Sequence, residues 1–340
     1  MPATADTNGL DQLDALLLNL VAEGRVPGLA IRILAGGTCL FEKGYGMADL
    51  QSGIPIDPAR TVFRVASVSK PITATALACL VSDGMLRLDD PLARYVPEYP
   101  DYGITLGQLA SHTAGIRGYR GKEYALNKPY GIADSLALFR NDPLVFEPGA
   151  GYLYNTYDFV LLSLAMERAA GQPFGALVRE RVLDPLGMQH TEAEIPGRPV
   201  PGQAVFYTRT RGGFREATPV DNRFKLAGGG YLSTVGDISR LGRACLQGLP
   251  CGKEALQEVL SPQTAAGRPT WYGLGWQVSE DAAGRPYYGH IGNGVGAYGN
   301  FFVYPQQEVV VSLLINCTDP KVQPVLDAGV EALFLTVDTA

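Results

Sequence analysis

The spacing of hydrophobic residues along the chain predicts strands near both ends and helices in the middle. Residues 10–24 (LDQLDALLLNLVAEG) repeat apolar positions at helical intervals and finish at a glycine, which predicts an amphipathic helix. Residues 28–46 contain two strand-like runs around a turn at 35–38, which predicts a β-hairpin. After about residue 225, β-rich runs such as AYGNFFVYP and EVVVSLLIN return, and the tail VLDAGVEALFLTV again has helical spacing.

The middle of the chain has a different pattern. From about residue 85 to 224, short helical segments alternate with loops rich in proline and glycine, and strand signals are few. Short consecutive strands favour a mostly antiparallel sheet, in which the N-terminal hairpin joins the C-terminal strands. We therefore expect an α+β fold, in which residues 1–66 and 225–340 together form a sheet-containing α/β domain and residues 67–224 form a mostly helical domain. The active site is expected at their junction, where binding clefts are common.

The stretch FRVASVSKPITA, residues 63–74, places Lys70 three residues after Ser67 and directly before Pro71. Residues three apart share a helix face, so Lys70 can lie beside the Ser67 hydroxyl and take its proton. Proline is tolerated only in the first turn of a helix, so Pro71 places the helix start at about Ser67 or Val68. The rest of this helix is apolar on nearly every side, where a lysine loses its charge more easily. A serine three residues before a lysine is expected about once by chance in such a chain, and the proline and apolar helix raise this one above chance.

Seven blocks of sequence, taken in order, resemble the class C β-lactamase and penicillin-binding-protein-like serine hydrolases, which include the family VIII carboxylesterases. The blocks are FRVASVSKPITA (63–74), ITLGQLASHTAGI (104–116), EPGAGYLYNTYDFVLLS (147–163), PLGM (185–188), GGGYLSTVGDISRL (228–241), YGLGWQV (272–278) and GHIGNGVGAYG (289–299). The resemblance extends from about residue 10 to 335. It implies a serine β-lactamase/DD-peptidase-like fold, with a helical domain against an α/β domain and the active site between them.

The resemblance also implies roles for individual residues. Ser67 is the nucleophile that becomes acylated, and Lys70 is its base partner. Tyr154 stands where the family has a tyrosine that passes a proton to the leaving group and activates water, provided that a nearby lysine lowers its pKa. The backbone N–H groups of Ser67 and Asn293 form the oxyanion hole. Gly292 lets the substrate come close to the strand.

Two departures from the family concern the substrate. The family usually has Tyr-x-Asn, and its asparagine helps hold the lysine and the substrate's acylamino group, whereas this chain has Tyr154, Asn155 and Thr156. His290 replaces the lysine of Lys-Thr-Gly, which supplies a permanent positive charge for a substrate carboxylate. A histidine with an unperturbed pKa is mostly neutral at pH 7, so carboxylate-bearing penicillins and peptidyl-D-Ala are disfavoured more than uncharged esters. Asn155, Thr156 and His290 remain candidates for substrate binding, although a histidine or tyrosine taken alone is more often a packing residue.

Other aromatic residues and histidines are weighed in the same way. His112, in the SHTAG segment, is expected to be structural and near the cleft, and His190 is expected at the surface. The loops at 116–135 and 195–225 should shape the pocket, with Tyr119, Tyr130 and Phe224 as candidates for its lining.

These observations lead us to expect a serine hydrolase with an acyl-Ser67 intermediate, most simply a carboxylesterase acting on small esters. One alternative keeps the nucleophile and takes an amide: a D-amino-acid peptidase, a DD-carboxypeptidase or a β-lactamase. Another is a non-catalytic ligand-binding homologue, against which the retention of Ser67 and Lys70 speaks. Neither a metal nor an organic cofactor is expected, because no Cys/His spacing resembles a zinc site and acyl transfer needs none. The expected partner is a small-molecule ester or amide.

Composition restricts the partners and the compartment. The chain of 340 residues has 28 basic and 34 acidic residues and no basic run, which disfavours nucleic acid, and its apolar runs are too short for a membrane span. The start, MPATADTNGLDQ, lacks the pattern of a signal peptide, so we expect a cytoplasmic protein as written, or a periplasmic or secreted one if a signal was removed. Cys245 and Cys251 are close enough for a loop disulfide, and the sequence leaves open whether it forms.

Overall fold

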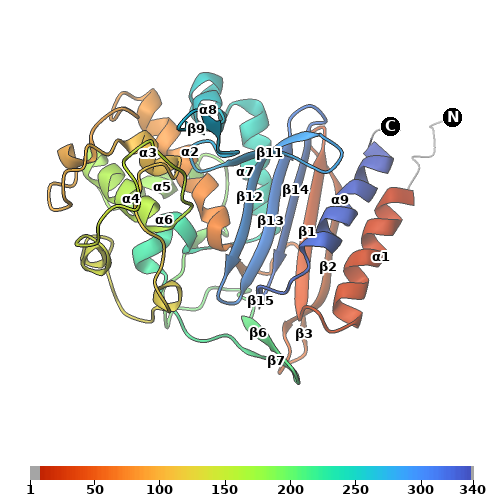
Figure 1. The fold of residues 1–340 in the computed structure, drawn as a ribbon. Coiled ribbons are helices and arrows are strands. Elements are labelled where there is room, and N and C mark those ends of the chain that lie inside the picture. The colour runs from red at the N-terminus through yellow and green to blue at the C-terminus, as the bar shows by residue number, and fades with distance from the viewer. Residues whose placement is uncertain (1–7, 338–340) are drawn as a thin grey trace.

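The computed structural model describes residues 8–337, and a seven-stranded antiparallel sheet forms its centre (Figure 1). The strands lie in the order β11-β12-β13-β14-β1-β2-β3. Their bounds are β1 (Gly28–Ala35), β2 (Thr38–Asp49), β3 (Ile54–Pro55), β11 (Gln277–Glu280), β12 (Pro286–Gly294), β13 (Ala297–Tyr304) and β14 (Val309–Ile315). The smaller strands are β4 (Phe63–Arg64), β5 (Glu192–Ala193), β6 (Tyr207–Thr210), β7 (Gly213–Glu216), β8 (Tyr231–Ser233), β9 (Thr264–Ala265), β10 (Arg268–Pro269) and β15 (Cys317–Thr318).

Helices cover both faces of this sheet (Figure 1). They are α1 (Asn8–Ala22), α2 (Ser69–Ser82), α3 (Leu106–Ala110), α4 (Tyr157–Ala170), α5 (Phe174–Val178), α6 (Leu226–Gly229), α7 (Val235–Gln247), α8 (Lys253–Leu260) and α9 (Gln323–Val337). Helices α1 and α9 lie side by side on one face, while α7 and the group around α2 lie on the other side (Figure 1). The chain therefore has the predicted α+β fold.

The predicted N-terminal hairpin is present and joins the C-terminal strands. Strand β1 pairs with β2 on one side and with β14 on the other, for example Ile31 opposite Leu313. The turn between β1 and β2 contains Gly36 and Gly37, which have φ angles of 54° and 80°. Two consecutive residues with positive φ form the tight turn whose twist matches a hairpin, and glycine adopts this conformation without steric cost. The two ends of the chain thus complete one sheet.

Strand β14 explains why VVVSLLI is almost continuously apolar. Val309, Val311 and Leu313 pack with α1 and α9, whereas Val310 and Leu314 belong to the cluster on the opposite face. Successive side chains of a strand point to opposite faces, so a strand covered on both sides needs apolar residues at both sets of positions.

The outer layer is held by the apolar stripe of the first helix. Leu13, Leu17 and Leu20 of α1 pack against the sheet together with Leu326 and Leu333 of α9. Burial of a leucine side chain contributes about 1.5–3 kcal/mol relative to leaving it exposed. The helix predicted at residues 10–24 is therefore fixed by its leucines.

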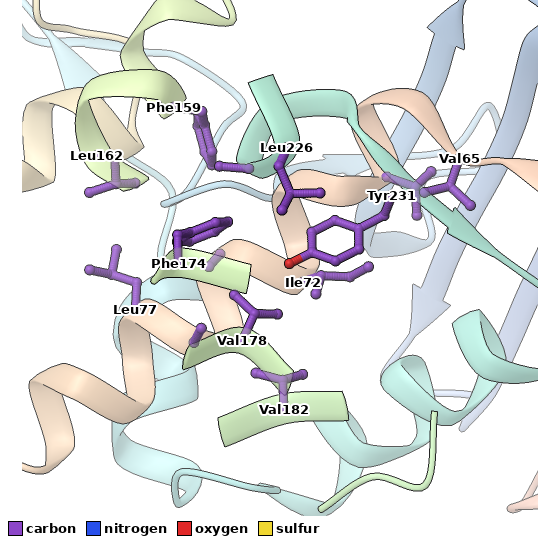
Figure 2. Close-up of a cluster of buried hydrophobic side chains, with 14 of the residues drawn as sticks. Val65, Ile72, Leu77, Phe159, Leu162, Phe174, Val178, Val182, Leu226 and Tyr231 are labelled. Carbon is purple, nitrogen blue, oxygen red and sulfur yellow. The ribbon is translucent and has the colours of Figure 1, made fainter. Parts of the chain in front are cut away.

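Helix α2 lies at the centre of the helical side of the molecule and is buried at every residue from Ser69 to Leu80. Side chains from four further elements surround it (Figure 2). These neighbours are Phe159 and Leu162 of α4, Phe174 and Val178 of α5, Leu226 of α6 and Tyr231 of β8. One 3₁₀ turn precedes the helix, which begins at Ser69, two residues after Ser67, with Pro71 still inside its first turn. The helix start predicted at Ser67 or Val68 is thus displaced by the 3₁₀ turn.

The segment after residue 225 is less strand-rich than the pattern suggested, because it also supplies α7 and α8. Gly242 of α7 lies directly against the sheet, since a Cβ there would be 2.6 Å from the Val310 side chain. The boundaries of the two domains stay a prediction.

All five cysteines are free thiols. Cys251 has its thiol in hydrogen-bonding contact with Cys79 of α2, not bonded to Cys245. The disulfide that the sequence left open is therefore not formed in this structure. Across residues 8–337, no helix has the length and apolar character needed to cross a membrane.

Candidate active site

Ser67 lies in a single 3₁₀ turn, η1 (Ala66–Val68), between β4 and α2. Ala66 has a φ of 45°, a left-handed conformation that costs a residue with a Cβ about 1–2 kcal/mol. Strand β12 packs closely on this turn, since a Cβ on Gly292 would lie 2.4 Å from the Val65 carbonyl oxygen. Gly292 is therefore required for the contact between strand and turn, a reason that the sequence alone did not reveal.

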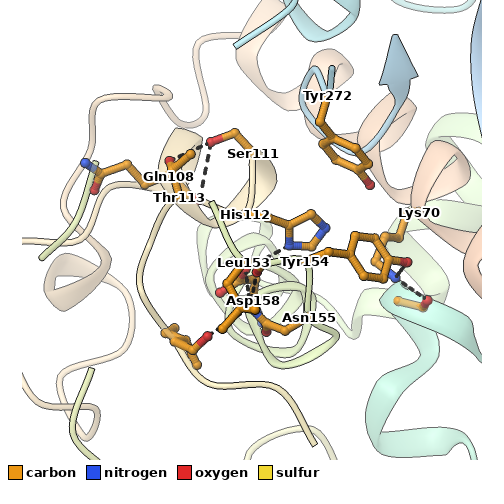
Figure 3. Close-up of polar contacts among 12 residues, drawn as sticks. Lys70, Gln108, Ser111, His112, Thr113, Leu153, Tyr154, Asn155, Asp158 and Tyr272 are labelled. Atoms are coloured by element: carbon orange, nitrogen blue, oxygen red, sulfur yellow. Dashed lines mark hydrogen bonds and ion pairs between the residues drawn. The ribbon is translucent and has the colours of Figure 1, made fainter. Parts of the chain in front are cut away.

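Two side chains contact the Ser67 hydroxyl, those of Lys70 and Tyr154, which lie side by side in Figure 3. The Ser67 Oγ lies 3.3 Å from Lys70 Nζ and accepts a hydrogen bond from the Tyr154 hydroxyl at 2.8 Å. Lys70 Nζ also donates to the Tyr154 oxygen at 2.7 Å and to the Gly228 carbonyl at 2.9 Å. The structure thus brings together the serine, lysine and tyrosine that the sequence blocks singled out, although 84 residues separate the lysine from the tyrosine.

The surroundings of Lys70 favour its neutral form. Burial lowers the pKa of Lys70 to about 7, a shift that the nearby Lys225 cation enhances and the Asp158 carboxylate opposes. A lysine with this pKa is about half neutral at physiological pH, and a neutral amine can accept a proton. The sequence argument from an apolar helix is consistent with this direction.

Tyr154 has the opposite tendency. Burial of its hydroxyl raises the pKa of Tyr154, and the hydrogen bond with Ser67 only partly offsets this. The tyrosine is therefore protonated at neutral pH. The lowered pKa that the proton-shuttle role was expected to require is not found, so in this arrangement Tyr154 is a hydrogen-bond donor and Lys70 is the group able to act as a base.

A buried polar network of His112, Asp158 and Asn155 lies next to Tyr154 (Figure 3). The Asp158 carboxylate accepts hydrogen bonds from His112 Nδ1 at 2.8 Å and from Asn155 Nδ2 at 2.7 Å. The His112 ring packs on the Tyr154 ring, with centroids 4.6 Å apart. Burial lowers the pKa of His112 and raises that of Asp158. His112 is thus structural and close to the site, as expected.

Asn155 and Thr156 occupy different environments. The Asn155 amide is buried and also donates to the carbonyls of Ile116 and Leu153, so it points into the protein. Thr156, in contrast, lines a cavity together with Ser67. The structure therefore places the Asn155 side chain inside the protein and Thr156 at the wall of the cavity that Ser67 also lines.

His290 is buried and both of its ring nitrogens are engaged. Its Nδ1 donates to the Ile291 carbonyl at 2.7 Å, so Nε2 carries the lone pair that accepts from the Tyr272 hydroxyl at 3.0 Å. Burial and the nearby Lys70 lower the pKa of His290 to about 3. No positive charge is therefore present where the resembled family has its lysine. His190, by comparison, is exposed, as expected.

The backbone N–H of Asn293 points toward the edge of β12 that β11 leaves free. The Ile291 N–H donates to the Gln277 side chain on the β11 side, and backbone N–H groups two residues apart in a strand point the same way. Strand β11 pairs with β12 only as far as Gly289, so the Asn293 N–H has no strand partner there. Asn293 lines the same cavity as Ser67, where an N–H group can meet a developing oxyanion.

The cavity beside Ser67 has a volume of about 90 Å³. Of the three aromatic candidates, Tyr119 lines it, whereas Tyr130 does not and Phe224 is fully buried in the core. Sequence reasoning missed two basic residues of the lining, Arg64 and Lys225. Their positions in the sequence could have indicated them: Arg64 belongs to the block that contains Ser67, and Lys225 lies three residues before the start of the Gly-rich block at 228–241.

The family model described as Beta-lactamase matches residues 13–335 of the chain. The chain belongs to this family. The resemblance drawn from the seven sequence blocks is therefore confirmed.

Two curated proteins of known name are similar to this chain in sequence. Serine beta-lactamase-like protein LACTB, mitochondrial, of Homo sapiens is 29% identical to this hydrolase over 86% of the chain and 71% of its own length. Esterase EstB of Burkholderia gladioli is 35% identical over 52% of the chain and 50% of its own length.

The fold of this hydrolase is shared with a solved amidase. The crystal structure of D-amino acid amidase from Ochrobactrum anthropi SV3, complexed with L-phenylalanine amide, has a TM-score of 0.84 at 22% identity and covers 96% of this chain and 99% of its own. Esterases and D-amino acid amidases are thus among the proteins that share this fold or family. Residues 1–7, which belong to the segment used to predict the compartment, lie outside the described residues.

Proposed function

We propose that this hydrolase cleaves small carboxylic esters through an acyl-Ser67 intermediate. The observation that carries the proposal is the contact of one hydroxyl, Ser67 Oγ, with both Lys70 and Tyr154, at 3.3 and 2.8 Å. A serine needs a base within hydrogen-bond reach to become a nucleophile, and Lys70 has a pKa, about 7, that suits a base at neutral pH.

The proposed acylation step uses Lys70 as the proton acceptor. Neutral Lys70 takes the Ser67 proton while Oγ bonds to the carbonyl carbon, and the carbonyl oxygen becomes an oxyanion held by the backbone N–H groups of Ser67 and Asn293. The ester C–O bond then breaks, and the leaving alkoxide receives a proton from the Lys70 ammonium, directly or through the Tyr154 hydroxyl. Water repeats the sequence on the acyl-enzyme and releases the carboxylic acid.

The preference for esters over β-lactams and D-peptides rests on His290. This histidine is neutral and its two nitrogens are bonded within the protein, so it provides no fixed charge for a carboxylate on the leaving-group part of a substrate. An ester with an uncharged alcohol needs no such charge, so the replacement of the family's lysine by His290 should not weaken its binding. Esterase EstB, a relative over about half of the chain, has a name that fits the same activity.

The proposal is tested by initial rates on three substrates measured side by side: p-nitrophenyl butyrate, a chromogenic cephalosporin and D-phenylalanine p-nitroanilide. We expect the ester to be turned over fastest, and Ser67→Ala to lower its rate by at least about 10³-fold, because loss of a nucleophile leaves only background catalysis. Ser82→Ala, near the end of the same helix, is the matched control and should retain the wild-type rate. Faster turnover of the cephalosporin or the D-amide would overturn the ester assignment, and near-wild-type activity of Ser67→Ala would overturn the nucleophile.

A further inference from the structure

Two basic side chains line the cavity beside Ser67, and no carboxylate lines it within the part of the chain that the structure describes. These are Arg64 of β4 and Lys225, which directly precedes α6. Neither takes part in the contacts of the Ser67 hydroxyl. Their charges therefore need a separate explanation.

Arg64 is already neutralised. Its Nε and Nη2 donate to the two carboxylate oxygens of Glu194 at 2.6–2.9 Å, and its Nη1 donates to the Val295 carbonyl at 2.8 Å. Glu194 also accepts a hydrogen bond from Asn222 at 2.8 Å. The Arg64 guanidinium and the Glu194 carboxylate thus form a buried, bidentate ion pair.

Lys225 is the cation that remains. Its residue is 8% exposed, and its Nζ donates to one protein group, the Tyr124 carbonyl, at 2.5 Å. No carboxylate among residues 8–337 forms an ion pair with it. The ammonium also lies 5.6 Å from the centroid of the Tyr119 ring, another part of the cavity wall. Burying a charge without a counter-ion is costly unless a ligand supplies that counter-ion.

We infer that Lys225 binds a carboxylate on the acyl part of the substrate, so that the preferred esters are monoesters of short dicarboxylic acids. The inference rests on the proposed ester hydrolysis and adds the substrate class. A cavity of about 90 Å³ that begins at Ser67 suits a short chain, with its carboxylate reaching Lys225 and its ester carbonyl at the nucleophile.

The acyl part fits this cation better than the alcohol part does. The acyl group stays attached to Ser67 through both chemical steps, so one ion pair keeps its carbonyl aligned for attack by serine and then by water. An alcohol that was held by a buried cation would instead keep the place that the incoming water needs. The neutral His290 agrees with an uncharged alcohol.

The experiment compares matched pairs of methyl esters by pH-stat: monomethyl succinate with methyl butyrate, monomethyl glutarate with methyl pentanoate, and monomethyl adipate with methyl hexanoate. We expect the wild-type kcat/KM to favour the anionic ester at least tenfold in one or more pairs. Lys225→Met should lower this ratio at least tenfold, and Lys225→Arg should restore part of it because it keeps the charge. Lys128→Met, an exposed lysine of a nearby loop, is the control and should leave the ratio unchanged.

A binding measurement separates this inference from the proposed function. Titration of glutarate into Ser67→Ala by calorimetry needs no turnover, and binding that disappears in Ser67→Ala/Lys225→Met supports the anion site even if no ester is hydrolysed. Neutral esters turned over faster than their anionic partners in every pair would overturn the inference and leave ester hydrolysis standing. Equal loss of both ester types in Lys225→Met would also overturn it, because it would mark Lys225 as structural.

Discussion

The two sides of the central sheet bury different kinds of side chain. The side covered by α1 and α9 packs mainly leucine, valine and isoleucine, as at Leu17 and Leu333. The side that contains α2 buries apolar residues as well, but it also encloses ionisable ones such as Lys70, Asp158 and Lys225. One face of the sheet thus buries mainly apolar side chains, and the other also buries ionisable ones.

This difference indicates that burial has different consequences on the two sides of the sheet. In the outer layer, formed by α1 and α9, each buried leucine adds stability in proportion to the apolar surface that it removes from water. On the inner side, which contains α2, burial shifts pKa values. It lowers the pKa of Lys70 to about 7 and keeps His290 neutral. Substitution of a buried leucine on the outer side should therefore lower the free energy of unfolding without changing catalysis, whereas substitution of Lys70 on the inner side should lower catalysis without lowering the free energy of unfolding.

The largest effect is expected for Lys70→Met. Methionine keeps an unbranched side chain of similar length but cannot accept the Ser67 proton, so kcat/KM for p-nitrophenyl butyrate should fall about 10²–10⁴-fold. Thermal unfolding should occur at or above the wild-type temperature, because a buried amine has been replaced by an apolar group. Lys128→Met is the exposed control for removal of one lysine. A rate within threefold of wild type would show that another group is the base.

On the outer side, Leu17→Ala should lower the free energy of unfolding by about 2–5 kcal/mol, because it leaves a cavity between α1 and the sheet. Its kcat should stay at the wild-type value at temperatures where the protein is folded. Leu18→Ala changes the same residue type one position along, where the side chain is 53% exposed, and should change stability little. Urea unfolding and ester hydrolysis on the three proteins test the pair. A large loss of kcat in folded Leu17→Ala would mean that the two sides are coupled.

The pH dependence should report Lys70. Below its pKa of about 7 the lysine is protonated and cannot accept a proton, so kcat/KM for methyl butyrate should rise about tenfold per pH unit up to about pH 7 and then level off. His112 and His290, whose pKa values burial lowers, stay neutral over this range, and Tyr154, whose pKa burial raises, stays protonated.

The neutral ester is chosen for this profile because Lys225 also titrates: burial and Arg64 lower its pKa to about 8, and Glu194 partly opposes this shift. The titration of Lys225 should affect anionic esters instead. A flat profile from pH 5.5 to 8.5 would contradict the assignment. The same rise persisting in Lys70→Met would contradict it as well.

Much of the fold was predictable because it depends on local pattern. The leucines of α1 and the paired glycines at 36–37 define the first helix and the hairpin by spacing and backbone conformation alone. The 3₁₀ turn at Ala66–Val68 was not predictable, since its left-handed Ala66 is held by β12, a strand more than 200 residues away in sequence. Helix α7 was missed because the surrounding strand signals dominated that segment.

The site was predictable where the chemistry requires particular residue types at short spacing, as for Ser67 and Lys70. The site was less predictable where the role of a residue depends on the direction in which its side chain points. Neighbouring residues Asn155 and Thr156 face opposite environments, and only the fold shows that the threonine reaches the cavity. Lys225 was missed for a related reason: its importance comes from the absence of a buried counter-ion, which depends on where Glu194 lies.

The smallest effect is predicted for a substitution next to His290, on the inner side of the sheet. Tyr272→Phe removes the hydroxyl that donates to His290 Nε2, and a buried acceptor left without a partner costs about 1–3 kcal/mol in the free energy of unfolding. The histidine should nevertheless stay neutral, because burial and the nearby Lys70, which lower its pKa, are both retained in the variant. Cephalosporin turnover should therefore not increase. Tyr152→Phe, which changes a more exposed tyrosine of the same aromatic cluster, is the control. A gain in cephalosporin turnover by Tyr272→Phe alone would mean that one hydrogen bond, and not burial, withholds a positive charge from this side of the sheet.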